Sequence, residues 1–284
     1  MRKTFVLLSV FLLSMLPAFS QSFENSMLWK ISGNGIENPS YVFGTFHMLC
    51  PDQLVISEKL IRSMKECDRL VLELDFDDPN LMASMQTGMM FTDGTSAKDY
   101  LNDEEYKLVS GFFAEKMQMP FQMIAGIKPF FLSALTMIYF MDCQPASMEQ
   151  KLMETAGKEV IGLESVEDQM NFIDNIPLED QKSMLISGVE DLEEMDEMTS
   201  KMVETYLKED LAGIQSITEE YMTEDYVELN EELIVSRNHD WVPKIDALIR
   251  EHSCFIAVGA GHLGGEAGLL NLLQKEGYTV EAVN

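Results

Sequence analysis

The chain twice runs a short apolar segment into the sequence Gly-x-x-His. Residues 41–47 read YVFGTFH and residues 255–262 read FIAVGAGH. Both segments are rich in the β-branched and aromatic residues that favour strands. Gly44, Gly259 and Gly261 lack a Cβ, so the backbone there can turn sharply and allow another group to approach closely. The repeat therefore predicts two strands, each with a histidine just beyond its carboxyl end.

A predicted helix and a second strand follow each of these segments. Residues 54–67 carry apolar side chains at helical spacing before the strand of residues 68–76. Residues 264–277 form a helical stretch before the strand of residues 278–283. Strand–helix–strand units join parallel strands through right-handed crossovers. We therefore predict an α/β (α+β) fold, in which two related strand–Gly-x-x-His–helix–strand halves form a central sheet with a large helical insertion.

The predicted insertion, about residues 80–236, is acidic, helical and rich in methionine. No linker or low-complexity tract separates it from the rest, so residues 21–284 are predicted to form a single domain. We expect most of the methionines to fill the core. The alternative is that they cover a substrate groove, since their flexible side chains adapt to varied ligands.

The first 20 residues have the features of a secretory signal peptide. Arg2 and Lys3 precede an apolar run from Phe5 to Leu16, and Ala18–Ser20 match a small-x-small cleavage site. This run is too short to span a bilayer, and no later run is long enough. We predict a mature chain that begins at Gln21 and is exported to the periplasm or the extracellular space; an uncleaved anchor is the alternative.

The charge balance excludes some partners. The chain has 48 acidic side chains against 20 lysines and arginines, a formal net charge of −28. Such a surface repels phosphate backbones and anionic lipids, so we predict no nucleic-acid partner and no binding to membrane surfaces. Cationic partners are compatible with this charge, although a solvated acidic surface is the simpler explanation. The oligomeric state is not predicted.

The four cysteines fall into two groups. Cys67 and Cys254 lie in or beside apolar strand patterns, where cysteine is often a small buried hydrophobic residue. Cys50 and Cys143 lie in loop-like stretches and are the better candidates for a disulfide, which export would permit. No Cys-x-x-Cys sequence occurs, which argues against a thiolate zinc site or a redox motif.

Acidic residues accompany two further predicted strands. Glu73 interrupts the apolar segment LVLELDF, and Glu164 ends the strand in KEVIGLES. Ligands in open α/β sheets bind at the carboxyl ends of strands, so we expect these glutamates to meet His47 and His262. Two imidazoles and one carboxylate suit a divalent metal and leave positions open for water or substrate. The spare carboxylate would then be available as a general base.

Each of these elements also has a simpler structural explanation. A single Gly-x-x-His is a weak motif, and His47 alone is more simply explained as a hydrogen-bonded histidine. Glu164 could belong to the cap of the next helix, because Ser165 and Asp168 match a capping box. The repetition of one context at two of the chain's four histidines favours a functional site.

The same segments resemble the TraB/PrgY/GumN family. The resemblance runs over nearly all of the chain after residue 20. This family is related to the Tiki proteins and, more distantly, to the ChaN and erythromycin-esterase-like proteins. It implies a metal-dependent protease that uses manganese or cobalt, with zinc as an alternative. The resemblance is carried by SYVFGTFHML, LVLELD, KPFF, GLESVEDQ, SRNHDWVPKI and VGAGHLGGEAGLLNLLQKEGY.

The resemblance assigns roles to individual residues. His47, His262 and Glu73 would hold the metal, and Glu164 would be a base or an additional ligand. Arg237 would orient the substrate or stabilise an oxyanion, although a structural ion pair with a buried glutamate is an equal alternative. We predict an exported metal-dependent hydrolase, in the first place a peptidase acting on peptide or protein segments. The alternatives are a non-catalytic protein that sequesters a peptide or haem, and a metal-dependent esterase.

Overall fold

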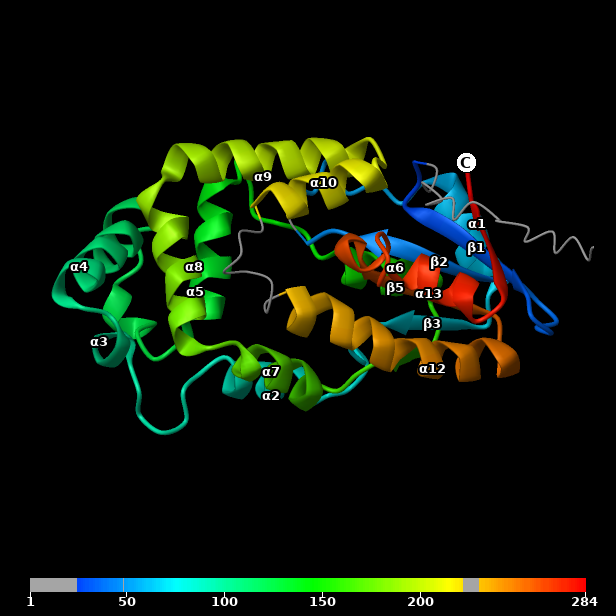
Figure 1. Cartoon of the computed structure of the whole chain (residues 1–284), viewed down its shortest axis with the longest axis horizontal. Coiled ribbons are helices and arrows are strands. Elements are labelled where there is room, and N and C mark those ends of the chain that lie inside the picture. The colour runs from blue at the N-terminus through cyan, green and yellow to red at the C-terminus, as the bar shows by residue number, and fades with distance from the viewer. Residues whose placement is uncertain (1–24, 48, 222–229) are drawn as a thin grey trace, which may run out of the picture.

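The computed structural model describes residues 25–47, 49–221 and 230–284. The predicted signal peptide of residues 1–20 lies outside the described residues. A single six-stranded sheet forms the centre of the described part of the chain, and helices pack around it (Figure 1). In the order β4-β3-β5-β2-β1-β6, the strands are β1 (Leu28–Gly33), β2 (Ser40–Thr45), β3 (Arg69–Leu72), β4 (Val160–Gly162), β5 (Cys254–Gly259) and β6 (Tyr278–Ala282).

The two strands that precede the Gly-x-x-His histidines lie side by side in the sheet. β2 and β5 pair in parallel, with Thr45 opposite Gly259. β3 pairs in parallel with the other side of β5, and β4 pairs in parallel with β3. β1 pairs antiparallel with both β2 and β6. The predicted α/β class is therefore confirmed, but the two halves interlock: β5 of the second half lies between β2 and β3 of the first.

Helices pack against both strands and connections of the sheet. α1 (Glu58–Glu66) and α13 (Leu269–Lys275) connect the strands of the two halves, and α12 (Ser236–Glu251) runs along the sheet (Figure 1). Apolar side chains from these helices and the strands are buried together in one core. This core fixes the strands, and therefore fixes where their carboxyl ends lie.

α6 (Met148–Ala156) also packs against the sheet, where Met148 and Leu152 join the core, and most of the other helices form a lobe beside it (Figure 1). This lobe has a second apolar core, which includes Phe113, Leu132 and Leu185. None of the helices in the described ranges is long and apolar enough to cross a membrane. The helical elements between β3 and α12 are α2 (Leu81–Gly88), α3 (Ala97–Tyr100), α4 (Asp103–Gly111), the π-helical η1 (Phe112–Lys116), η2 (Phe121–Met123), α5 (Pro129–Met137), η3 (Ile138–Phe140), α6 (Met148–Ala156), α7 (Val166–Asn175), α8 (Leu178–Glu190), α9 (Leu192–Leu207), α10 (Leu211–Tyr221) and the π-helical η5 (Glu231–Val235).

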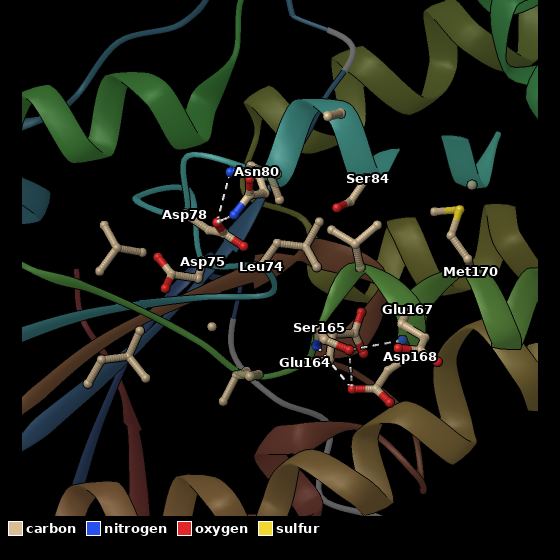
Figure 2. A pocket seen from close by; sticks show the side chains of 18 of the residues that line it. Leu74, Asp75, Asp78, Asn80, Ser84, Glu164, Ser165, Glu167, Asp168 and Met170 are labelled. Atoms are coloured by element: carbon tan, nitrogen blue, oxygen red, sulfur yellow. Dashed lines mark hydrogen bonds between the residues drawn. The ribbon is translucent and has the colours of Figure 1, made fainter. Parts of the chain in front are cut away.

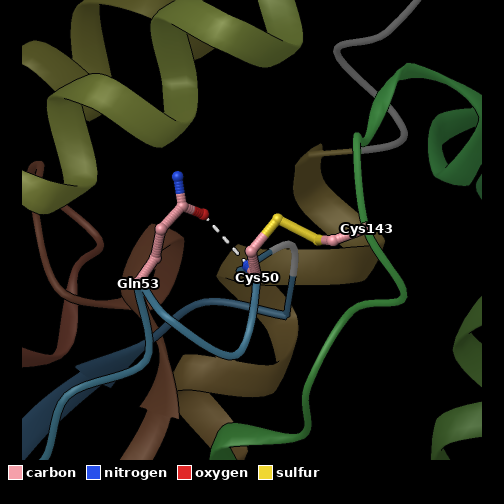
Figure 3. Close-up of a disulfide and its surroundings, with 3 residues drawn as sticks. All are labelled: Cys50, Gln53 and Cys143. Carbon is pink, nitrogen blue, oxygen red and sulfur yellow. Dashed lines mark hydrogen bonds between the residues drawn. A yellow bond between two sulfur atoms is a disulfide. The ribbon is translucent and has the colours of Figure 1, made fainter.

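A disulfide joins the first Gly-x-x-His segment to this lobe. Cys50, three residues after His47, is bonded to Cys143, and their Cα atoms lie 5.7 Å apart (Figure 3). Beside the bond, the amide of Ala146 donates a hydrogen bond of 2.9 Å to the carbonyl of Leu49. The two loop cysteines favoured from the sequence are thus the bonded pair. Cys67 and Cys254, expected to be buried, are buried and free.

Candidate active site

The predicted site residues come together at the carboxyl end of the sheet. Glu73 directly follows β3, and Glu164 follows β4 by two residues. His47 and His262 follow the neighbouring strands β2 and β5. Because these four strands are parallel, all four side chains leave the sheet at the same end, where Arg237 of α12 contacts three of them directly.

The guanidinium of Arg237 lies at the centre of the site. Its Nη2 atom donates to Glu164 Oε1 at 2.7 Å and to Glu73 Oε2 at 2.6 Å. Its Nε atom donates to Glu164 Oε2 at 3.2 Å, which completes a two-pronged ion pair. Its Nη1 atom lies 3.2 Å from His262 Nε2 and donates to the carbonyl of Leu233 at 3.0 Å. Only 6% of Arg237 is exposed, so these partners replace water around the charge.

Local helical geometry explains the placement of Arg237. Arg237 and Trp241 are one helical turn apart on the buried face of α12, and the guanidinium carbon lies 4.7 Å from the indole centre. The indole Nε1 atom donates to Glu164 Oε2 at 3.0 Å. The helix begins directly after η5, a π-helical turn of the type that is frequent at functional sites.

Glu164 is committed to neighbouring protein groups. Its Oε1 atom also accepts a hydrogen bond of 3.1 Å from Gln169 Nε2, so both oxygens are engaged. Burial raises the pKa of Glu164 above its usual value, although the adjacent Arg237 acts in the opposite direction. In this geometry Glu164 holds Arg237 in place. The predicted role of Glu164 as a base or a metal ligand remains a prediction.

The capping box considered for Glu164 is present in its neighbours. Ser165 accepts from the amide of Asp168, and the Asp168 carboxylate accepts from the amide of Ser165, at the start of α7. These two residues cap the helix without the Glu164 side chain. The cap therefore leaves the Glu164 carboxylate free to turn towards Arg237.

Glu73 links the end of β3 to β5 and α12. Its Oε1 atom accepts a hydrogen bond of 2.7 Å from the amide of Gly259, and its Oε2 atom accepts from Arg237. Burial acts to raise the pKa of Glu73, but His262, Arg237 and the Gly259 amide outweigh it and lower the pKa to about 2. A carboxylate with so low a pKa is a weak general base at neutral pH. Its ionised oxygens suit a ligand role better.

His262 is held in one orientation. Asn238 donates through Nδ2 to the carbonyls of His262 (3.1 Å) and Ala267 (2.9 Å), so its Oδ1 atom is the acceptor for His262 Nδ1 at 2.8 Å. Only 3% of His262 is exposed, and burial lowers its pKa to about 4. The ring is therefore neutral at pH 7, and the lone pair of Nε2 faces the site.

His47 has a different environment but a similar hydrogen bond. Its Nδ1 atom lies 3.1 Å from Oε1 of Glu149, a residue of α6, and 63% of the His47 side chain is exposed. Desolvation opposes the charged ring, but the hydrogen bond and the charge of Glu149 prevail and raise the pKa of His47 to about 9. In both histidines a polar acceptor engages Nδ1 and leaves Nε2 to face a metal. For His47 the metal would have to displace the proton that the raised pKa keeps on Nε2 at pH 7.

The histidines and glutamates are the donor types that bind a divalent metal. In the observed geometry, however, they are not spaced to share one ion. No three His, Cys, Asp or Glu side chains within the described ranges converge on a point where a metal ion could bind. Arg237 contacts both Glu73 and His262, two of the three predicted ligands. Metal binding through these residues would require Arg237 Nη1 to leave His262 Nε2.

The glycines of the two motifs have separate roles. A Cβ on Gly44 would lie 2.8 Å from Leu263 Cδ1 and 3.1 Å from the Cα of Ala260, so glycine there lets β2 pack directly against the second motif. Gly259 and Gly261 show only ordinary contact distances of 3.4 Å or more. None of the three motif glycines is among the glycines with positive φ, although the chain enters the 3-10 turn Ala260–His262 directly after Gly259. At Gly44 the close approach of another chain segment is present.

Two pockets border the site. The larger, about 1370 Å³, lies between α2, α7 and the loops after β3 and β4, and Glu164 lines it (Figure 2). The other residues of the site, His47, Glu73, Arg237 and His262, do not line this pocket. A smaller pocket of about 180 Å³ lies over the second motif, where Gly261 and Thr218 are among its lining residues. The smaller pocket is therefore the nearer of the two to His262.

Glu149, Asn238 and Trp241 belong to the site but were not predicted from the sequence. The helical spacing of Arg237, Trp241 and Ile245 places the arginine in line with core positions, and this signal could have identified Trp241 as its neighbour. For Glu149 the available signal was the cysteine pairing. A bond between the loops that follow His47 and precede α6 brings Glu149 towards His47. No pattern in the sequence marks Asn238 as a partner of His262.

The fold and the site define an α/β protein with a histidine–glutamate–arginine centre at the ends of four parallel strands. The model of the TraB/PrgY/gumN family matches residues 27–282, and the chain belongs to this family. It is 24% identical over 327 residues to the protein named Metalloprotease TIKI2 of Danio rerio, with 92% of this chain aligned. The alignment covers 62% of that relative's length. No solved structure matches the chain.

Proposed function

We propose that the chain is an exported metal-dependent hydrolase that cleaves peptide or protein segments. The main support is the matching preparation of two imidazoles: Nδ1 of each ring meets an acceptor, Glu149 for His47 and Asn238 for His262. Glu73 stands beside them at the ends of adjacent parallel strands. Family membership and the similarity to a metalloprotease support the hydrolase class.

In this proposal His47, His262 and Glu73 hold a manganese, cobalt or zinc ion. The bound ion would polarise the scissile carbonyl and lower the pKa of a bound water. All five N–H groups of Arg237 are engaged, so it can bind a substrate carboxylate or a developing oxyanion only through Nη1, once that atom leaves His262. Its charge also keeps Glu73 ionised. Glu164 holds Arg237 in position, so it acts on the reaction through that residue.

A specific observation favours peptide capture without turnover as the second candidate. Arg237 already balances the charge of Glu73 and contacts His262 Nε2, so the site is electrostatically satisfied without an ion. A protein that only captures peptides needs no open coordination position. Metal content separates the two candidates.

The test is elemental analysis of the mature protein, prepared without chelators and offered manganese, cobalt or zinc. We expect about one ion per chain, as a single site of this donor set implies, lost in both His47→Ala and His262→Ala. His239→Ala is the matched control, because His239 is exposed on α12. A peptide library then tests cleavage, which Glu73→Gln should abolish.

Three results would change the proposal. Folded protein that binds none of the three metals would remove the hydrolase mechanism and leave capture. Full cleavage by Glu73→Gln would remove the role given to Glu73. Turnover of small esters with no cleavage across the peptide library would identify an esterase.

A further inference from the structure

The helical lobe contains a cavity of about 790 Å³ whose walls come from α5, α8, α9 and α10. These helices lie beside the sheet end that carries the site (Figure 1). Five methionines line the cavity, and each is half-buried, as expected for methionines that cover a groove. A surface of this kind can adapt to side chains of different shape. The five are Met137, Met184, Met195, Met198 and Met202.

The rim of the cavity is acidic. Glu190, Asp191, Glu194 and Glu220 belong to its lining, and that lining contains no lysine, arginine or histidine. Glu220 forms an ion pair of 2.7 Å with Lys201. The other three carboxylates make no ion pair with the described residues. An apolar interior with uncompensated negative charge at its edge selects a ligand that is apolar and cationic.

The cavity lies next to residues that contact the two motifs. Thr218 lines both this cavity and the 180 Å³ pocket over the second motif. On α9, Met202 precedes Tyr206 by one helical turn, about 6 Å along the axis. The Tyr206 hydroxyl donates to the carbonyl of Gly44 at 2.9 Å, and its ring stacks on Phe46 at 5.0 Å. The wall of the cavity on α9 is therefore one helical turn from a residue that contacts the first motif.

We propose that this cavity binds a large apolar side chain of a peptide segment that carries lysine or arginine beside it. The apolar side chain enters among the methionines, and the basic side chain meets Glu190, Asp191 or Glu194. This inference rests on the proposed function, because it names the substrate class of the adjacent site. Anionic amphiphiles such as haem or fatty acids would bring their carboxylates against the acidic rim, which argues against them.

Binding is measured by fluorescence anisotropy on the full mature chain after removal of metals, so that the result does not depend on turnover. The probe is a labelled ten-residue peptide with a Leu-Phe centre flanked by lysines. Two matched peptides replace the lysines by glutamates or the Leu-Phe centre by serines. We expect binding of the first peptide alone, weakened by added salt because the rim is exposed.

The decisive variant is Glu190→Lys/Glu194→Lys. We expect it to weaken binding about tenfold, since two exposed charge pairs each contribute up to about 1 kcal/mol. The control is Glu193→Lys/Glu197→Lys, which makes the same charge change on exposed residues of α9 outside the cavity lining. We expect the control to change the affinity less than about twofold, because charge pairs at a distance are screened. Ser187→Trp, which fills the cavity from an exposed position, should also weaken binding.

The outcomes separate this inference from the proposed function. Equal weakening by both double variants, no peptide binding, or tighter binding of the glutamate peptide, oleate or haemin would overturn the cavity assignment. Metal-dependent cleavage that is unaffected by the rim variant would also overturn it while the hydrolase stands. Selective binding by a protein that binds no metal would support the cavity and remove the hydrolase.

Discussion

The two Gly-x-x-His segments occupy neighbouring strands, yet their histidines have opposite properties. His262 is 3% exposed, and its pKa falls to about 4. The His47 side chain is 63% exposed, and its pKa rises to about 9. The motif places both histidines beyond equivalent strands, but the partners differ: an amide from α12 for one, a carboxylate from α6 for the other. A repeated motif therefore determines position, while the surrounding helices determine charge.

The two halves of the site are also held differently. The half around His262 is held by α12, which runs along the sheet, and the half around His47 depends on α6 and the loop before it. His262 packs against Trp241 with ring centres 4.5 Å apart and is fixed by Asn238. His47 is tied to α6 through Glu149 and to the loop before α6 through the nearby disulfide. Four experiments would break or sharpen this contrast.

The largest effect is expected from Arg237→Met. The change leaves Glu73 and Glu164 without their cation, and breaking a buried ion pair in this way costs about 3–5 kcal/mol. The free energy of unfolding in urea measures the loss. Arg250→Met is the matched control, since Arg250 is an exposed arginine of the same helix paired with Asp246, and such pairs contribute at most about 1 kcal/mol. Equal losses in the two variants would show that the buried network does not stabilise the second half.

The next effect is expected from Cys50→Ser/Cys143→Ser. Removing a bond between cysteines 93 positions apart should lower the free energy of unfolding by about 2–4 kcal/mol. Wild-type protein in reducing buffer should match the variant, and the variant should not respond to reductant. If the variant unfolds at the same urea concentration as the oxidised wild-type protein, the bond does not anchor the first half.

Alanine at each histidine compares the halves directly. His262→Ala removes a buried ring and leaves Asn238 Oδ1 without its donor, so we expect a loss of about 1–3 kcal/mol in the free energy of unfolding. His47→Ala removes a mostly exposed ring but leaves the buried Glu149 carboxylate without its cation, so we expect a smaller loss of about 1 kcal/mol, because water can reach the vacated space. Both curves come from the same urea titration. A larger loss in His47→Ala than in His262→Ala would show that the exposed fraction of each ring does not predict how much it stabilises the fold.

The fourth change, Glu149→Gln, tests metal affinity and not folding stability. The amide keeps an acceptor for His47 Nδ1 but removes the charge, and a change in such a supporting residue typically weakens metal affinity about tenfold or more. Calorimetric titration with manganese measures the change. Glu154→Gln is the control, because Glu154 is an exposed carboxylate of the same helix. If both variants bind equally well, His47 does not hold the metal through this arrangement.

Much of the sheet could be predicted from the sequence, because apolar strands and turn residues are local signals. The interlocking of the halves could not, since nothing local places β5 between β2 and β3. The predicted strand of residues 68–76 ends at Leu72, which puts Glu73 just outside it and lets its carboxylate cross to Gly259. The predicted insertion is interrupted by β4, which joins the sheet beside β3.

The candidate site shows the same division. Residues that follow strands could be identified, since the carboxyl ends of parallel strands share one edge of a sheet. The partners of the site come from helices whose packing is tertiary, so Asn238 and Glu149 carried no local signal. For Arg237 the sequence left two roles open, and the structure shows ion pairs with Glu73 and Glu164.

Whether the His47 half of the site is held in place depends on the Cys50–Cys143 bond, and that bond forms only under oxidising conditions. In a reducing compartment both thiols persist, and the loop that carries His47 is then held only by noncovalent contacts, such as the hydrogen bond between Leu49 and Ala146 and the pair of His47 with Glu149. The half around His262 needs no oxidation, because its partners lie in α12. A newly made chain can thus form one half of its centre before oxidation and secure the other half only afterwards, which would keep the site incomplete until the chain reaches an oxidising environment.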